Sequence, residues 1–128
     1  MIMNNKRLGT AFERRVCEAL KNNGYWVHFI APDARGAQPF DVIAVKRGFA
    51  MAIDCKTCAA GRFNISRLED NQVMAFERWL ECGNDSPVVA VEHEDNIYVI
   101  PYTYLKNNKS VKLDVETQDN MIQWIENR

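Results

Sequence analysis

The sequence predicts an α/β domain built on a central mixed β-sheet of about five strands that is flanked by helices. Its 128 residues are 47% hydrophobic and 26% charged, which is typical of one globular domain with a core of its own. The predicted order is helix, three strands, helix, two strands, helix, and three consecutive strands before a helical crossover favour a mixed sheet. No repeat, linker or low-complexity tract interrupts the chain, so residues 1–128 are predicted to form a single domain.

The first helix and the first strand are predicted from hydrophobic periodicity. Apolar residues at helical spacing predict an amphipathic helix over residues 7–22, which Asn23-Gly24 ends. Residues 25–30 are aromatic and β-branched, a pattern that predicts a strand. The proline and glycine content of residues 31–39 predicts a loop.

A β-hairpin and a second helix are predicted next. Residues 40–46 and 49–56 are apolar strands joined at Lys46-Arg47-Gly48. After a connector over residues 57–65, Ser66 is a predicted N-cap, and Glu69 is its capping-box partner three residues later. This helix is predicted to run to about Glu81.

The C-terminal half continues with two more strands, over residues 88–91 and 97–100, around an acidic turn. Residues 101–114 carry no clear pattern beyond a short helical turn and an edge segment. Thr117 is predicted to cap a final helix.

Charge is distributed unevenly along the chain. The net charge of −1 argues against a generally basic nucleic-acid-binding surface. Residues 1–63 nevertheless hold ten Lys/Arg and five Asp/Glu, a balance of +5, and residues 64–128 hold six and twelve, a balance of −6. A molecule with one basic side is able to bind a phosphate backbone. Chance segregation of surface charge is the alternative.

The compartment is predicted from the start of the chain and from the cysteines. The first residues lack the apolar core of a signal peptide, and no apolar run reaches the length of a membrane span, so we expect a cytoplasmic protein. The four cysteines are scattered among apolar residues, which is more typical of buried thiols than of disulfides. Cys55 and Cys58 form a C-x-x-C pair, but no second ligand pair at matching spacing supports zinc.

Three charged residues at strand ends form the main candidate site. Asp54 and Lys56 are two residues apart, so on an extended strand both side chains leave the same face, and Cys55 leaves the other. Pairing of the predicted hairpin brings Asp41 close to Asp54. Two carboxylates beside one ammonium group form a site for a divalent cation and an activated water. The alternative is that all three are solvated strand-end charges.

Two helical residues break local rules near this site. Gln72 lies within the apolar face of the second helix, where it must find hydrogen-bond partners or cost about 1–3 kcal/mol. It either caps backbone at the start of the helix or reaches over the sheet toward Asp54 and Lys56. Glu13 lies at the edge of the apolar face of the first helix, a position that an ordinary boundary charge also occupies.

Together these motifs resemble a known family of nucleases. Gly9-x-x-Phe12-Glu13, Pro39-Phe40-Asp41, Asp54-Cys55-Lys56 and Asn71-Gln72 resemble the PD-(D/E)xK superfamily. Within it, the chain is similar to Holliday-junction resolvases of the RecU and archaeal Hjc type, with a phage-encoded version as one alternative. The resemblance covers residues 7–100 and implies a restriction-endonuclease-like core.

The resemblance also implies roles for individual residues. Asp41 and Asp54 would bind Mg²⁺ or Mn²⁺ through hard oxygen ligands, with the carbonyl of Cys55 as a further ligand. Glu13 would complete the acidic cluster, directly or through water. Lys56 would polarise the attacking water or stabilise charge developing at the phosphate, and Gln72 would orient Lys56 or the water. The implied reaction is phosphodiester hydrolysis that leaves 5′-phosphate and 3′-hydroxyl ends.

The implied substrate is branched DNA, bound by a symmetric homodimer that presents two sites to a four-way junction. Basic residues of the positively charged half are candidate phosphate contacts, which position DNA without reading its sequence. They are Arg14, Arg15, Lys21, Arg35, Lys46, Arg47 and Arg62.

Two departures from the family pattern leave alternatives open. Asp54 stands where glutamate is usual, and the loop over residues 31–39 is too short for the long stalk of RecU-type enzymes. One alternative is a sequence-specific or nicking nuclease of restriction or repair type. The other is a catalytically inactive PD-(D/E)xK module that binds DNA or a protein.

Overall fold

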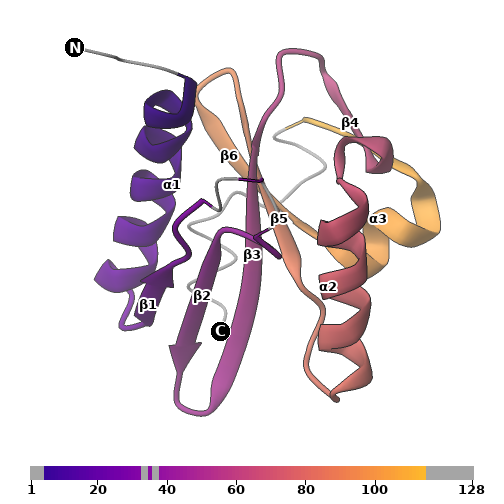
Figure 1. Cartoon of the computed structure of the whole chain (residues 1–128). Helices are drawn as coiled ribbons and strands as arrows, with labels where there is room; N and C mark the ends of the chain where they lie inside the picture. Colours follow the sequence, from indigo (N-terminus) through magenta and orange to yellow (C-terminus); the bar gives the residue numbers. More distant parts are fainter. Residues whose placement is uncertain (1–4, 33–34, 36–37, 115–128) are drawn as a thin grey trace.

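The computed structural model describes residues 5–32, 35 and 38–114 (Figure 1). Their elements in chain order are α1 (Asn5–Asn22), β1 (Trp26–Phe29), β2 (Val42–Lys46), β3 (Phe49–Thr57), β4 (Arg62–Asn64), a 3-10 turn (Ile65–Arg67), α2 (Asp70–Glu81), β5 (Val88–His93), β6 (Asn96–Pro101), α3 (Tyr102–Asn108) and β7 (Ser110–Lys112). Within this described part, no helix has the length and apolar character needed to cross a membrane.

The central sheet has five strands in the order β1-β2-β3-β5-β6. All neighbours are antiparallel except β3 and β5, which are parallel and are connected through α2. This is the mixed five-stranded sheet that the order of elements predicts. The β2–β3 hairpin closes through Arg47 and Gly48, both at positive φ, as a two-residue turn matching the strand twist requires.

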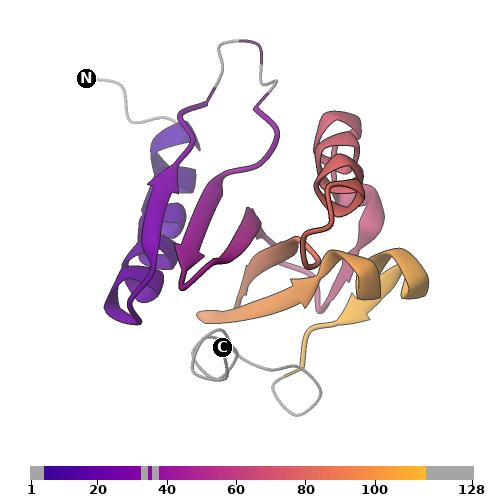
Figure 2. The same cartoon turned by 90° about the horizontal axis from the view of Figure 1, so that it is seen from below.

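Helices cover both faces of the sheet and bury a separate core on each (Figure 2). On one face α1 packs Val16 and Leu20 against Val42 and Ile53. On the other face lie α2, α3 and the small β4–β7 sheet, with Phe76 and Phe63 fully buried. Alternate residues of β2, β3, β5 and β6 therefore belong to different cores, which fixes the register.

The structure corrects several predicted boundaries. The N-cap of α2 is Glu69 rather than Ser66, and Gln72 completes its capping box. Ser66 lies in the 3-10 turn instead, and the side chain of Asn64 caps that turn. Helix α1 begins two residues before the predicted start, at Asn5.

Two short strands were not predicted as a pair. Residues 62–64 and 110–112 form the two-stranded antiparallel β4–β7 sheet, where the sequence predicts only a connector and an indistinct segment. The helical turn predicted after residue 101 is confirmed as α3. The final helix predicted from Thr117 lies outside the described residues.

Candidate active site

Asp41 immediately precedes the first residue of β2, and three contacts fix it. Its backbone N–H donates to the carbonyl of Ile53 at 3.0 Å, and its carbonyl accepts from the N–H of Ile30 at 2.8 Å. Its carboxylate Oδ2 accepts from the backbone N–H of Cys55 at 2.7 Å. The carboxylate thus accepts a hydrogen bond from β3 in place of a backbone carbonyl of the neighbouring chain segment. Both backbone and carboxylate of Asp41 are held before any ligand arrives.

Asp54 lies opposite Asp41 on β3 and is fully buried. Its Oδ1 accepts a hydrogen bond from Nε2 of Gln72 at 2.8 Å. Its Oδ2 has no hydrogen-bond partner among the described residues and lies 3.4 Å from Nζ of Lys56, an ion-pair distance. Burial raises the pKa of Asp54 well above its ordinary value, and the charge of Asp41 raises it further, while Lys56 lowers it. The positive charge of Lys56 therefore only partly compensates the negative charge of the Asp54 carboxylate.

Gln72 fulfils both roles that the sequence leaves open. Its Oε1 accepts from the backbone N–H of Glu69 at 3.0 Å and completes the cap of α2. Its Nε2 reaches the sheet and donates to Asp54. The start of α2 is therefore fastened directly to the candidate site.

Glu13 approaches the cluster from the opposite face, because it lies on α1. Its Oε2 is buried without a hydrogen bond in the described part of the structure. Burial, and then the charge of Asp41, raise the pKa of Glu13 to about 7. Glu13 and Asp41 are therefore electrostatic neighbours, as the acidic cluster requires.

The donor set fits a hard divalent cation. Two buried carboxylate oxygens, on Glu13 and Asp54, have no hydrogen-bond partner within the described segments, and a cation would offset their charge. The side chain of Cys55 packs in the α1 core, away from Asp54, as predicted. Because N–H and C=O of one strand residue point to the same side, the Cys55 carbonyl faces the Asp41 side. Among the described residues, no three His, Cys, Asp or Glu side chains form a group that could hold a metal ion by themselves.

Comparison with known proteins identifies the family. The family model "Archaeal holliday junction resolvase (hjc)" matches residues 4–126, nearly the whole chain. The chain belongs to this family. A relative in Methanocaldococcus jannaschii, named crossover junction endodeoxyribonuclease Hjc, is 25% identical over 109 residues, which cover 84% of this chain and 77% of the relative.

The fold of the family is also confirmed by a solved structure. The Hjc of Archaeoglobus fulgidus, described as a Holliday junction resolvase from an archaeal hyperthermophile, superimposes with a TM-score of 0.69 at 18% identity. The match covers 92% of this chain and 95% of that one. The restriction-endonuclease-like fold predicted from the motifs is therefore the observed fold.

The predicted phosphate contacts of this Hjc-family chain lie in different surroundings. Arg15 forms an ion pair with Glu92, and Lys46 donates to the carbonyl of Asn23 at 2.8 Å. Arg62 donates to the hydroxyl of Ser110 at 2.9 Å. Arg47 is exposed at the tip of the β2–β3 hairpin, and Arg35 is exposed in the loop after β1. These cations are spread over several elements rather than gathered in one patch.

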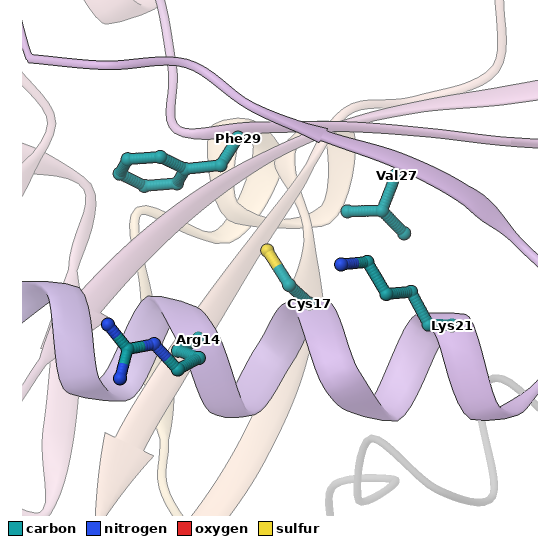
Figure 3. A pocket seen from close by; sticks show the side chains of 5 residues that line it. All are labelled: Arg14, Cys17, Lys21, Val27 and Phe29. Carbon is teal, nitrogen blue, oxygen red and sulfur yellow. The ribbon is translucent and has the colours of Figure 1, made fainter.

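Arg14 and Lys21, in contrast, lie together at one pocket between α1 and β1 (Figure 3). The pocket has a volume of about 240 Å³ and is also lined by Cys17, Val27 and Phe29. Sequence reasoning did not find these three residues. The available signal was the spacing of Glu13, Cys17 and Lys21, four residues apart on one helical face.

Proposed function

We propose that this protein is a metal-dependent endodeoxyribonuclease that resolves Holliday junctions. The observation that carries the proposal is the network of Asp41, Asp54, Lys56 and Gln72 between the β2–β3 hairpin and α2, with Glu13 of α1 within electrostatic reach of Asp41, in a chain of the Hjc family. Two elements on opposite faces of the sheet contribute to this one cluster. Ordinary solvated strand-end charges would not be buried there.

Asp41, Asp54 and the carbonyl of Cys55 are the proposed ligands of Mg²⁺ or Mn²⁺, and Glu13 completes the set directly or through water. The bound cation would neutralise charge on the scissile phosphate and lower the pKa of a water. Cys55 N–H and Gln72 each fix one oxygen of a ligand carboxylate, so these ligands need little reorganisation. The two carboxylates are thus already held in position to bind a cation through their oxygen atoms.

Lys56 is the proposed electrophilic group. Its ammonium group lies beside Asp54 with the side chain 15% exposed, so one side remains open to substrate. There it stabilises the negative charge that develops as water adds to phosphorus and the bond to the 3′-oxygen breaks. The products are a 5′-phosphate and a 3′-hydroxyl end.

The proposed substrate is a four-way DNA junction, bound by a homodimer. Both named Hjc relatives are junction-processing proteins by their names, and a junction presents equivalent strands to two symmetric sites. The basic residues of the first half of the chain are the proposed phosphate contacts. A sequence-specific or nicking nuclease and an inactive binding module are the rival functions.

A cleavage assay separates these functions. Four-way junction, linear duplex and single-stranded DNA of shared sequence are incubated with the protein and Mg²⁺ or Mn²⁺. We expect paired cuts in the junction alone, and loss of cutting in Asp41→Ala and Lys56→Ala. Equal cutting of duplex would contradict the resolvase function, and junction binding without cutting would support the inactive module. Unchanged cutting in both variants would exclude the proposed site.

A further inference from the structure

The pocket between α1 and β1 combines an apolar floor with a cationic rim. Cys17, Val27 and Phe29 supply the floor, and the exposed Arg14 and Lys21 supply the rim. Figure 3 shows Arg14 on one side of Cys17 and the ammonium group of Lys21 on the other, with Phe29 and Val27 facing them from β1. None of the pocket residues is acidic. A ligand that suits this surface has an apolar or aromatic body and carries negative charge.

The pocket adjoins the carboxylate cluster. Arg14 follows Glu13 in the chain, and Cys17 lies one helical turn beyond Glu13 on the same face. On the opposite wall, Phe29 precedes Ile30, whose N–H holds the carbonyl of Asp41. Burial raises the pKa of the Cys17 thiol, the charge of Lys21 lowers it, and the charges of Glu13 and Asp41 raise it, so these charges lie within electrostatic reach of the floor.

The volume and the position of the pocket indicate which part of a nucleic acid it binds. Its volume of about 240 Å³ is below the range of roughly 300–1,000 Å³ for drug-sized ligands, so it holds one nucleotide unit. From Glu13 to Lys21 the helix rises about 12 Å, which exceeds the 3.4 Å step of a stacked strand. The pocket thus lies one to a few nucleotides from the scissile phosphate.

We infer that this pocket binds an unpaired nucleotide of a branched DNA beside the scissile phosphate, with its phosphate between Arg14 and Lys21 and its base against Phe29 and Val27. The inference rests on the proposed nuclease function and adds a source of selectivity to it. A base within a duplex is unable to enter such a pocket, and extracting it costs a few kcal/mol. At a branch point the stacking between neighbouring base pairs is interrupted, so a base there leaves its pair at lower cost.

The test measures DNA affinity by fluorescence anisotropy in EDTA, so that no strand is cut. Lys21→Gln removes one rim charge, and Val27→Phe fills the pocket. Two controls place comparable changes elsewhere: Lys109→Gln beyond α3 repeats the loss of a lysine charge, and His28→Phe introduces the same phenylalanine at the next residue of β1, whose side chain leaves the other face. Thermal unfolding confirms that each variant is folded, and Lys21→Gln, at an exposed position, keeps the test valid if Val27→Phe is unstable.

We expect Lys21→Gln and Val27→Phe to weaken junction binding by about fivefold or more, as the loss of one stacked base does. Duplex binding and both controls should change less than about twofold. Abasic sites placed one at a time around the branch point should weaken binding by the wild type at one position. At that position Val27→Phe should show no further loss, because both changes remove the same contact.

Equal weakening of junction and duplex binding would overturn the inference and leave only a nonspecific phosphate contact. So would junction affinities that neither pocket variant changes. Failure of the proposed function is recognised separately, because it appears as absent cleavage of every DNA by the wild type with Mg²⁺ or Mn²⁺. The binding arm, measured without metal, still decides the pocket in that case.

Discussion

The carboxylate of Asp54 is fully buried, and among the residues that the structure describes only one of its two oxygens has a hydrogen-bond donor. Leaving a buried polar group unsatisfied costs about 1–3 kcal/mol, and Lys56 offsets this only in part, since the pKa of Asp54 remains raised. The fold therefore retains a group that weakens it. Such groups mark sites selected for function rather than for stability.

Asp54→Asn should stabilise the metal-free protein and abolish cleavage. The amide keeps the shape of the side chain and carries no charge, so we expect the free energy of unfolding at pH 7 to rise by about 1 kcal/mol or more. Urea unfolding in EDTA measures this change. Asp85→Asn, at an exposed position beyond the end of α2, is the control and should change stability by less than about 0.5 kcal/mol. A destabilised Asp54→Asn would show that Lys56 already compensates the charge.

Glu13 makes stability depend on pH. Its folded-state pKa of about 7 lies above the ordinary value of 4.5, so between these values the folded protein keeps a proton that the unfolded chain has lost. The free energy of unfolding of the metal-free protein should therefore fall as pH rises from about 4.5 to about 7. Glu13→Gln should reduce this fall. The pKa of Asp54 is also raised, so part of the decrease in the free energy of unfolding persists in Glu13→Gln.

Urea unfolding at several pH values in EDTA provides the measurement. Glu18→Gln is the matched control, because Glu18 is exposed on the same helix. If Glu13→Gln and Glu18→Gln both retain the full wild-type pH dependence, Glu13 is not the group that titrates.

At the scale of the elements, a partly buried group of hydrogen bonds joins α2 to α3. The hydroxyl of Tyr102 donates to Oε2 of Glu77 at 2.5 Å, and Nζ of Lys106 donates to the same carboxylate at 2.9 Å. Tyr102 also packs its ring on Phe76, with centroids 5.2 Å apart. This contact secures the helix that carries Gln72 to the site.

Tyr102→Phe should lower the free energy of unfolding by about 1–2 kcal/mol, because it removes a hydrogen bond to a charged group and keeps the ring. Urea unfolding measures the loss. Tyr104→Phe removes the same hydroxyl from an exposed position of α3 and should have almost no effect. Equal effects of the two substitutions would mean that the Glu77 contact contributes nothing to stability.

The elements that the sequence predicts correctly are those with strong local signals. The β2–β3 hairpin has two apolar strands and a turn at Gly48, and in α1 apolar residues recur at helical spacing over most of its length. The local sequence pattern is therefore enough to predict both elements. Strands β4 and β7 are three residues each and lie far apart in the chain, so only tertiary pairing reveals them. The N-cap of α2 is Glu69 rather than the predicted Ser66 because Ser66 lies within the 3-10 turn that precedes the helix.

The same contrast holds for the site. Asp41, Asp54 and Lys56 follow from a predicted hairpin and a residue spacing of two. The two roles of Gln72 do not, because its geometry depends on how α2 crosses the sheet. The pocket at Cys17 depends in turn on how α1 packs over an edge strand, and that packing is set by the whole core.

At the scale of the molecule, the site joins the two cores. Glu13 comes from the α1 face and lies within electrostatic reach of Asp41, and Gln72 comes from the α2 face and donates a hydrogen bond to Asp54. Neither core alone assembles the cluster. A ligand that binds the assembled cluster therefore stabilises the packing of both helices on the sheet, and global unfolding should report its binding.

Mg²⁺ or Mn²⁺ should accordingly raise the Tm of the wild type. A cation at one hundred times its Kd stabilises the folded state by about 2.7 kcal/mol, which for a domain of this size is a rise of roughly 10 °C. Differential scanning calorimetry at pH 7, with EDTA as reference, measures it. The double variant Asp41→Asn, Asp54→Asn should show a rise below about 2 °C, because amides replace both carboxylates. An equal rise in the wild type and the double variant would place the cation elsewhere on the molecule and remove the proposed ligands from the reaction.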